Sequence, residues 1–381
     1  MKRMKVWLMM ALCAVIASCT ANEEEGLGIN DSQTIVLRIG SAADTKAVET
    51  PGTSSDKATL TNGYLFFANE KGAIKRCFKL LGSGSTDVSK LEILISEFTG
   101  ENESKGFTFT NVPGDVTQVY ILGNVSDAEG SDTEEDNIRS KTTLDAIKAL
   151  NIKVTDQKTY ASVTMDGLGN VTGSGTTKEA TVNLKVFCSR LEIPSLTASG
   201  AITGFQVDGI YVSHFYKQVP LTEEVSSTEL FKYADDTKTQ YDDTYAMLAD
   251  VAGGSGSGLG ETSGKTVSAG SGKAWAYQFI PGASGDNREG IRVVIALSNI
   301  QGVSSLNGTT QYLNIRGLVD KGNNDPNPEP MALVRGMIYS MGTNLTFDEG
   351  DLSPLPNPDD ISLTVKIIVT PWGVKEVKPV L

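Results

Sequence analysis

The sequence predicts an all-β protein, most simply two β-sandwiches in tandem. Three observations support this prediction. Apolar and polar residues alternate in many short runs, turn-forming glycines are frequent at 39 of 381 residues, and helical spacing occurs in one short segment. Alternation with a period of two is typical of half-buried strands, and turn signals between short strands are typical of sandwiches. A chain of this length favours two domains.

The first nineteen residues are typical of a bacterial export signal that ends in a lipid-attachment cysteine. Three basic residues within the first five precede an apolar run over 6–15, and Ala17-Ser18-Cys19 follows. These are the parts of a signal peptide. The apolar run is shorter than the roughly 20 residues that span a membrane. We therefore expect a signal peptide at 1–18 and acylation of Cys19, with an ordinary signal peptide and a chance cysteine as the alternative.

An isolated strand is expected next. In Thr34–Ile39 the side chains of Ile35, Leu37 and Ile39 lie on one face, and the other face is mixed. A loose segment of small and polar residues, 41–57, follows. A lone strand with a long connector behind it is unusual in a compact domain.

One short helix is expected in the first half of the chain. Thr142 or Thr143 is suited to cap it, and Leu144, Ile147 and Leu150 follow at helical spacing. A threonine before such a series is a common helix start.

Further strands are expected at 64–67, 107–110, 116–122, 182–193, 205–212, 275–280, 291–297, 311–315, 333–339, 361–370 and 374–381. The alternation in 182–193 changes phase near Ser189-Arg190, which indicates a β-bulge or a strand that passes between sheets. We place a domain boundary just before this run. A segment with three prolines, 354–359, precedes the last two strands, so these can stand apart from the preceding fold.

Charge and cysteine content narrow the class of protein. The formal net charge is -13 and the isoelectric point is near 4.7, which argues against nucleic-acid binding. Beyond Cys19 only Cys77 and Cys188 follow the signal, too few and too far apart for a disulfide framework or a zinc site. Cys188 is expected in the core, and a Cys77–Cys188 bridge stays open.

The motifs that imitate catalytic or binding sites are incomplete. His214 is the only histidine, and 264–266 lacks the first glycine of a phosphate-binding loop. The acidic segments 134–136, 235–236 and 320–325 are typical of solvated loops rather than glycosidase or calcium sites. We therefore expect no enzyme, no cofactor and no metal.

The order of these parts resembles the fimbrillin family, the major subunits of the type V pilus of Bacteroidales. The resemblance rests on Cys19, Thr34–Ile39, Lys46-Ala47, and the runs 182–193, 209–212, 333–339 and 363–372. It implies tandem Greek-key-like, transthyretin-like β-sandwiches with one or two short helices. The domains would cover 47–178 and 179–381, after a lipidated propeptide at 19–46.

In that family a surface protease removes the lipidated segment with its first strand, and a C-terminal strand of a neighbour replaces it. Carried onto this chain, the resemblance implies acylation at Cys19, for example with palmitate. A protease specific for Arg or Lys would cut between Lys46 and Ala47, with Arg38 as a second possible site. The displaced strand would carry Ile35, Leu37 and Ile39. Donor strands within 361–381 would carry Leu363, Val365, Ile367, Val369, Val374, Val377 and Val380.

The function expected from this resemblance is that of a structural pilin. It would be an outer-membrane lipoprotein precursor that joins identical or related subunits in a cell-surface fimbrium for adhesion. The alternatives are a tip or anchor subunit, a surface lipoprotein that binds glycan or protein, and a secreted hydrolase. The N-terminal residue of the surface-released protein would discriminate between a shaft and an anchor.

Overall fold

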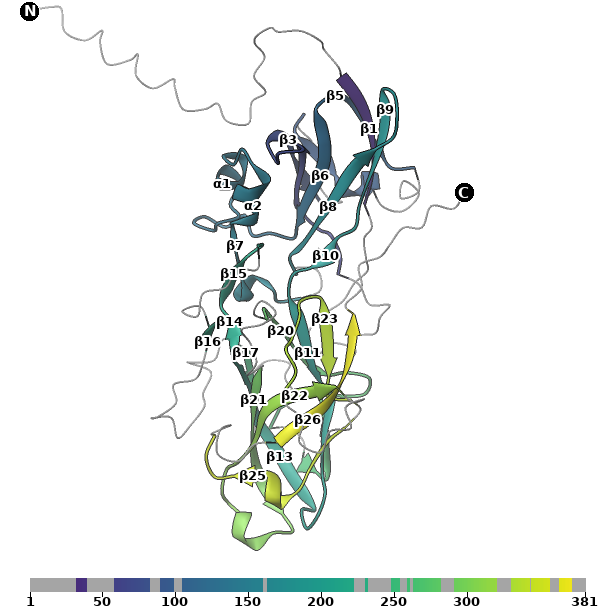
Figure 1. The fold of residues 1–381 in the computed structure, drawn as a ribbon. Coiled ribbons are helices and arrows are strands. Elements are labelled where there is room, and N and C mark those ends of the chain that lie inside the picture. The colour runs from purple at the N-terminus through teal and green to yellow at the C-terminus, as the bar shows by residue number, and fades with distance from the viewer. Residues whose placement is uncertain are drawn as a thin grey trace, which may run out of the picture.

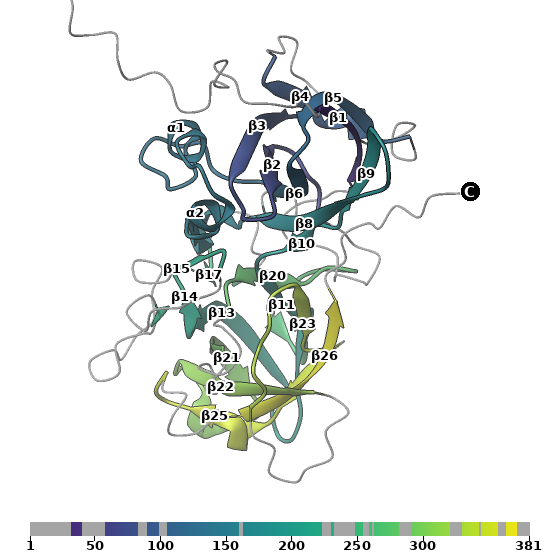
Figure 2. The ribbon, with the colours of Figure 1, turned by 45° about the horizontal axis from the view of Figure 1, so that its top comes forward.

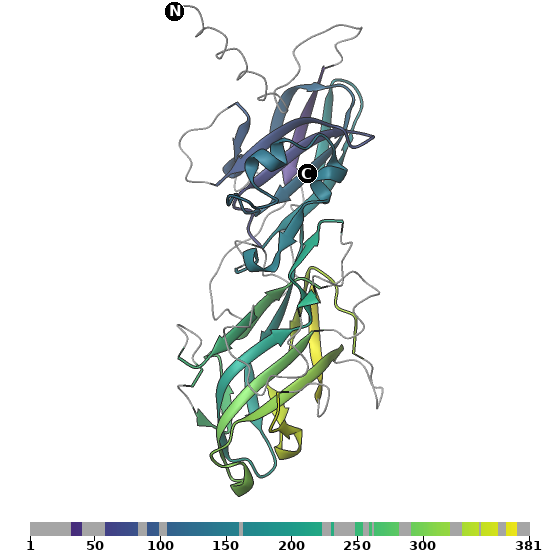
Figure 3. The same cartoon turned by 90° about the vertical axis from the view of Figure 1, so that its left-hand side faces the viewer.

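The structure is a computed structural model that describes residues 32–39, 58–82, 90–98, 105–159, 163–222, 230–231, 248–253, 259–260, 263–281, 291–320, 330–342, 344–356 and 363–371. The described secondary structure is mostly β-strand, with two short α-helices, which confirms the predicted all-β fold. Two sheet-built units are stacked end to end (Figure 1, Figure 3).

The first unit is a nine-stranded sheet that curls upon itself (Figure 2). Its strands are β1 (Ser32–Ile39), β2 (Gly63–Asn69), β3 (Ile74–Leu81), β4 (Glu92–Leu94), β5 (Phe107–Pro113), β6 (Val116–Gly123), β8 (Met165–Thr172), β9 (Thr177–Val182) and β10 (Lys185–Val186). Their order is β4-β3-β2-β6-β8-β9-β1-β5, with β10 beside β8. The start of β8 pairs with β6 and its end pairs with β9, so this strand joins the two halves of the curl.

The helices of the first unit, α1 (Glu135–Arg139) and α2 (Leu144–Lys148), lie beside the sheet (Figure 1). The Thr143 hydroxyl accepts a hydrogen bond from the N–H of Ala146, which confirms the predicted cap. Leu144, Ile147 and Leu150 are buried, as their helical spacing predicts.

The second unit is a ten-stranded sheet in the order β17-β13-β21-β22-β26-β23-β11-β20, with β18 beside β13 and β25 beside β22. These strands are β11 (Ser189–Ile193), β13 (Gly204–Ser213), β17 (Leu248–Val251), β18 (Ser263–Gly264), β20 (Trp275–Phe279), β21 (Arg292–Gln301), β22 (Gln311–Asp320), β23 (Met337–Ser340), β25 (Leu352–Ser353) and β26 (Leu363–Pro371).

Short strands and 3-10 helices complete the described elements. A small three-stranded sheet contains β12 (Ser195–Ala198), β19 (Thr266–Ser268) and β24 (Leu345–Phe347), while β14 (Phe215–Tyr216) pairs with β16 (Leu230–Phe231). The strand β7 (Asn151–Lys153) pairs with β15 (Gln218–Pro220). The 3-10 helices are η1 (Ile95–Phe98), η3 (Val154–Asp156), η5 (Ser304–Leu306) and η6 (Glu349–Asp351).

The last described strand, β26, joins the two halves of the second sheet. Its first part, from Leu363 to Ile367, pairs in parallel with β22. Its second part, from Ile368 to Pro371, pairs in antiparallel with β23. Among the described strands, β26 is the hydrogen-bonded link between these two halves.

The chain passes from the first sheet to the second at Phe187 and Cys188, between β10 and β11. The division into domains at 47–178 and 179–381 stays a prediction, and β9 runs across residue 178. No helix in the described ranges is long and apolar enough to cross a membrane.

Two strand predictions were too long. The run expected over 182–193 is divided among the end of β9, β10 and β11. Alternation predicts a strand over 333–339, but β23 begins at Met337. Gly336 has a φ of +73°, which glycine adopts without steric strain, and a turn therefore precedes the strand. The backbone of Val334 instead hydrogen-bonds to the Tyr339 hydroxyl.

Candidate functional site

The strand β1 fills a slot between β9 and β5. It pairs in parallel with β9 and in antiparallel with β5 along most of its length. Its side chains alternate: Ile35, Leu37 and Ile39 are at most 1% exposed, while Thr34, Val36 and Arg38 are partly exposed. The inward face predicted from the sequence is therefore buried in the core.

The position of β5 depends on β1. Among the described strands, β5 has β1 as its only hydrogen-bonded sheet partner. Its side chains also pack across the curl, because the Phe109 ring lies 4.9 Å from the ring of Phe67 and 5.3 Å from that of Phe78. Removal of β1 would thus leave β5 held by ring packing and by its turn to β6.

A buried amide closes one end of the slot. The side chain of Gln33 is in phase with the inward residues and is 4% exposed. Its Nε2 donates to the backbone oxygen of Pro113 at 2.9 Å and to that of Val116 at 2.8 Å. These two carbonyls flank the turn between β5 and β6. Its Oε1 has no hydrogen-bond partner among the described residues.

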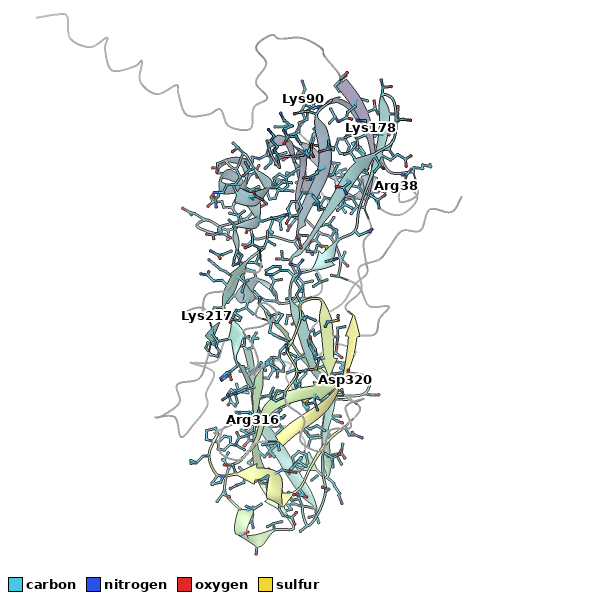
Figure 4. The ribbon with its side chains drawn as sticks, viewed as in Figure 1. Arg38, Lys90, Lys178, Lys217, Arg316 and Asp320 are labelled. Atoms are coloured by element: carbon cyan, nitrogen blue, oxygen red, sulfur yellow. The ribbon has the colours of Figure 1, made fainter. Side chains whose placement is uncertain are left out.

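The other end of the slot is narrow. Gly106 has a φ of +70°, and a Cβ atom there would lie 2.8 Å from the backbone oxygen of Leu37, which is too close for a real contact. On the outer face the Arg38 guanidinium lies 3.2 Å from the Glu179 carboxylate of β9. Arg38 points away from the body of the sheet (Figure 4). The strand in the slot therefore fits closely against Gly106 here.

Burial of its apolar side chains contributes much of the free energy that keeps β1 in the sheet. Each buried Ile or Leu contributes roughly 1.5–3 kcal/mol, so its three aliphatic residues contribute roughly 5–9 kcal/mol before chain entropy is counted. A strand with three similar residues would regain about the same amount. The slot is therefore an apolar site that fits a strand with such an inward face.

The predicted site residues are distributed differently in the structure. Ile35, Leu37 and Ile39 lie together in the slot. Leu363, Val365, Ile367 and Val369 belong to β26, inside the second sheet. The predicted residues Cys19, Lys46, Ala47, Val374, Val377 and Val380 lie outside the described residues.

Sequence reasoning missed Gln33. It lies two residues before Ile35, so it continues the inward series, but the strand was expected to begin at Thr34. A polar residue in phase with a buried face was the available signal.

The histidine and the two described cysteines, which lie outside the slot, are buried in the structure. His214 is buried, has a φ of 64°, and its Nδ1 lies 3.0 Å from the Ser213 hydroxyl. Cys77 and Cys188 are both buried and form no disulfide with each other, and burial raises the pKa of the Cys188 thiol. In the described ranges no group of three or more His, Cys, Asp or Glu residues is arranged to hold a metal ion.

Comparison with known proteins identifies the fold. No family model and no curated protein sequence matches the chain. A solved structure of a candidate cell adhesion protein from Bacteroides eggerthii matches with a TM-score of 0.54 and 14% identity, over 90% of this chain and 96% of that chain. A candidate cell adhesion protein from Parabacteroides distasonis matches with a TM-score of 0.51 and 12% identity, over 91% and 98%. The chain shares the fold of these proteins.

A more distant match is a fimbrilin from Porphyromonas gingivalis. It is 10% identical over 90% of this chain and 98% of that chain, with a TM-score of 0.47.

Proposed function

We propose that this chain is a fimbrial shaft subunit that polymerises by strand exchange. It is exported as a lipoprotein acylated on Cys19, travels to the outer membrane, and is cut between Lys46 and Ala47 by a surface protease that cleaves after Arg or Lys. The cut removes β1, and a C-terminal strand of a neighbouring subunit takes its place. The assembled subunits form a cell-surface fimbrium for adhesion.

The observation that carries this proposal is the slot between β9 and β5. Loss of β1 would expose two unpaired strand edges and the core that Ile35, Leu37 and Ile39 cover. An unpaired edge beside an apolar cleft is a template for strand addition, in which backbone hydrogen bonds give affinity and side-chain pockets give specificity.

Processing and geometry together would give the assembly its direction. A cut after Lys46 separates β1 from the rest of the chain, so the lost strand no longer competes at high local concentration. The slot and the C-terminal segment are different surfaces, so the contact is head-to-tail. Such contacts build filaments when they do not close into rings. The fold shared with candidate cell adhesion proteins agrees with a surface role.

One observation favours a second candidate function. Because β26 lies inside its own sheet, residues 363–371 cannot leave without separating β22 from β23. A tip or anchor subunit, or a binding lipoprotein of the surface, would not need to lend a strand. The shaft proposal therefore requires the donor to lie beyond Pro371.

The test uses the full chain, secreted by a bacterium that sorts lipoproteins to its outer membrane and carries a trypsin-like surface protease. We expect the sheared wild-type protein to begin at Ala47 and to run as a ladder of multimers in gels unless it is boiled. Lys46→Ala should abolish both the new N-terminus and the ladder. Lys57→Ala, in the same connector, is the matched control and should behave as the wild type.

Two results would contradict the shaft proposal in different ways. A ladder that persists in Lys46→Ala would place the cut elsewhere, with Arg38 as the next site to examine. A wild-type protein that keeps its acyl chains on Cys19 and stays monomeric would favour the anchor or binding function.

A further inference from the structure

The slot contains a polar subsite that constrains which strand can enter it. The two carbonyl oxygens of Pro113 and Val116 converge on one donor, the Nε2 of Gln33, and Gln33 is 4% exposed. The next inward positions, Ile35, Leu37 and Ile39, lie in apolar surroundings. The slot therefore fits a strand with one hydrogen-bond donor followed by apolar residues two, four and six positions later.

An entirely aliphatic strand would fit this pattern poorly. It would cover the carbonyl oxygens of Pro113 and Val116 without offering them a donor. A buried acceptor that loses its partner carries its full desolvation penalty, whereas a made hydrogen bond contributes little by comparison. The position of Gln33 therefore discriminates between candidate donor strands more strongly than the apolar positions do. The apolar positions accept any residue of similar volume.

We propose that the slot takes residues 375–381 of a second copy of this chain, with Lys375 in the place of Gln33. This inference rests on the strand exchange proposed above and specifies its register. The Lys375 ammonium would donate to the carbonyls of Pro113 and Val116. Its aliphatic stem would cover the end of the slot, as long cationic side chains do at the edge of apolar surface.

The C-terminal sequence singles out this register. Between 361 and 381, Lys375 is the only residue with a donating side chain that has apolar residues at the next three alternate positions, in either chain direction. Those residues are Val377, Pro379 and Leu381, which would occupy the places of Ile35, Leu37 and Ile39. Pro379 has no N–H, so this register gives up one ladder hydrogen bond on the β5 side, where Leu37 pairs with Phe107. The series from Ile361 to Val369 has no donor on its apolar face.

The outer face of the slot supports the same register by charge. With Lys375 in the place of Gln33, Lys378 takes the place of Val36, whose parallel partner on β9 is Glu179. In the precursor Glu179 contacts Arg38, which leaves with β1. Lys378 would therefore restore a cation beside this carboxylate.

The fold supports a donor beyond β26. Residues 363–371 already pair with β22 and β23 of their own chain, on both edges. Donating these residues to a neighbour would leave the edges of β22 and β23 unpaired in the donating subunit. Residues 375–381 follow this strand in the sequence, so the second sheet of the donating subunit would stay intact.

The first test compares substitutions at Lys375 in the full chain, processed on the cell surface as above. Lys375→Met keeps the length of the side chain but removes the donor, and we expect about tenfold fewer boiling-sensitive multimers. Lys375→Gln supplies the amide that the precursor itself uses, and should keep multimers within about twofold of the wild type. Lys273→Met, at an exposed position outside both the slot and the C-terminal segment, is the matched control and should have little effect.

The second test measures the register directly. Val36 is paired with Thr108 on β5, and Thr108 is exposed. The N–H of Thr34 donates to the backbone oxygen of Thr176, just before β9. Val36 therefore also faces β9 with its N–H, and Val36 and Thr108 form a non-hydrogen-bonded pair, whose Cα atoms approach closely enough for a disulfide. Cysteines at Thr108 and Lys378 should therefore cross-link neighbouring subunits under oxidation. Cysteines at Thr108 and Thr364 test a register that uses β26.

The outcomes separate this inference from the proposed function. Wild-type protein without multimers would contradict the proposed strand exchange itself. Wild-type multimers combined with a fully active Lys375→Met variant would overturn the Lys375 register alone. Cross-linking from Thr108 to Thr364 rather than to Lys378 would assign the donor to β26.

Discussion

Ion pairs contribute to holding α1 against the first sheet, beside the burial of Ile138. The Lys79 ammonium on β3 lies 2.9 Å from the Asp127 carboxylate and 2.5 Å from that of Glu135, and Arg139 lies 2.7 Å from Glu135. Burial by itself raises the pKa of the Glu135 carboxyl, but hydrogen bonds from Lys79 and Arg139 outweigh it, so this pKa lies below its ordinary value. Burial lowers the pKa of Lys79, and its two carboxylate partners more than reverse this.

These shifts predict a loss of stability in acid. Because the folded pKa of Glu135 lies below its unfolded value, its contribution is complete above that unfolded value and is lost as the pH falls through the folded one. The free energy of unfolding should therefore decrease between about pH 5 and pH 3. Glu135→Gln should flatten this decrease and cost about 0.5–1 kcal/mol at pH 7, since the pair is partly solvent-exposed. Denaturant titration of the full chain at a series of pH values measures both effects.

Lys79→Gln provides the matching control, because it removes the cation and leaves the carboxylate. It should also flatten the decrease in the free energy of unfolding between about pH 5 and pH 3. A slope that is unchanged in both variants would show that other carboxylates control the acid sensitivity.

The two terminal described strands occupy inner positions of their sheets. The N-terminal strand β1 lies between β9 and β5, and the C-terminal strand β26 lies between β22 and β23. They differ in what their removal would leave. Without β1 the curl keeps the continuous path from β4 to β9, whereas without β26 the second sheet divides into two halves. We therefore expect the fold to tolerate the loss of β1 better than that of β26.

Two C-terminal deletions should consequently differ. Removal of 374–381 leaves β26 in place, so we expect a folded subunit that is secreted normally but cannot extend a multimer. Removal of 363–381 also removes β26, and we expect loss of cooperative unfolding or of secretion. Thermal melting by circular dichroism and the unboiled gel ladder distinguish the two variants. Multimers of normal length after the shorter deletion would exclude 374–381 as the donor.

At the scale of the whole molecule, one buried apolar cluster runs through both units, and polar and strand contacts join them as well. The Arg335 guanidinium lies 2.7 Å from Asp166 on β8 and 5.1 Å from the centre of the Phe187 ring. Asp166 also accepts a hydrogen bond from Tyr120 at 3.0 Å. The pairing of β7 with β15 adds a second connection.

Arg335→Ala should loosen this junction. It removes a partly buried ion pair and a cation–π contact, so we expect a cost of about 1–3 kcal/mol. Small-angle scattering of the full chain should show a wider spread of sizes, while both sheets keep their strand signal in circular dichroism. Arg316→Ala, which changes an exposed residue of β22, is the control (Figure 4). Identical scattering of the two variants would mean that Arg335 does not hold the units together.

Much of the local structure could be predicted from short-range patterns. The alternation in 34–39 predicted both the strand and its inward face, and Thr143 with Leu144 and Ile147 predicted a capped helix. The strand over 333–339 was predicted too long, because alternation does not reveal that Gly336 adopts a positive φ and a turn. Patterns of this kind describe which side chains are apolar, but not where the backbone reverses.

The sequence by itself determined that Ile35, Leu37 and Ile39 face a core and that the C-terminal run is a strand, because both properties follow from the periodicity of neighbouring residues. Only the tertiary structure decided that β1 lies between β9 and β5, that β26 is enclosed in its own sheet, and that Gln33 binds two carbonyls of the β5–β6 turn. The reason is physical: strand partners are chosen by hydrogen bonds between distant segments. Gln33 and Val116, for example, are 83 residues apart.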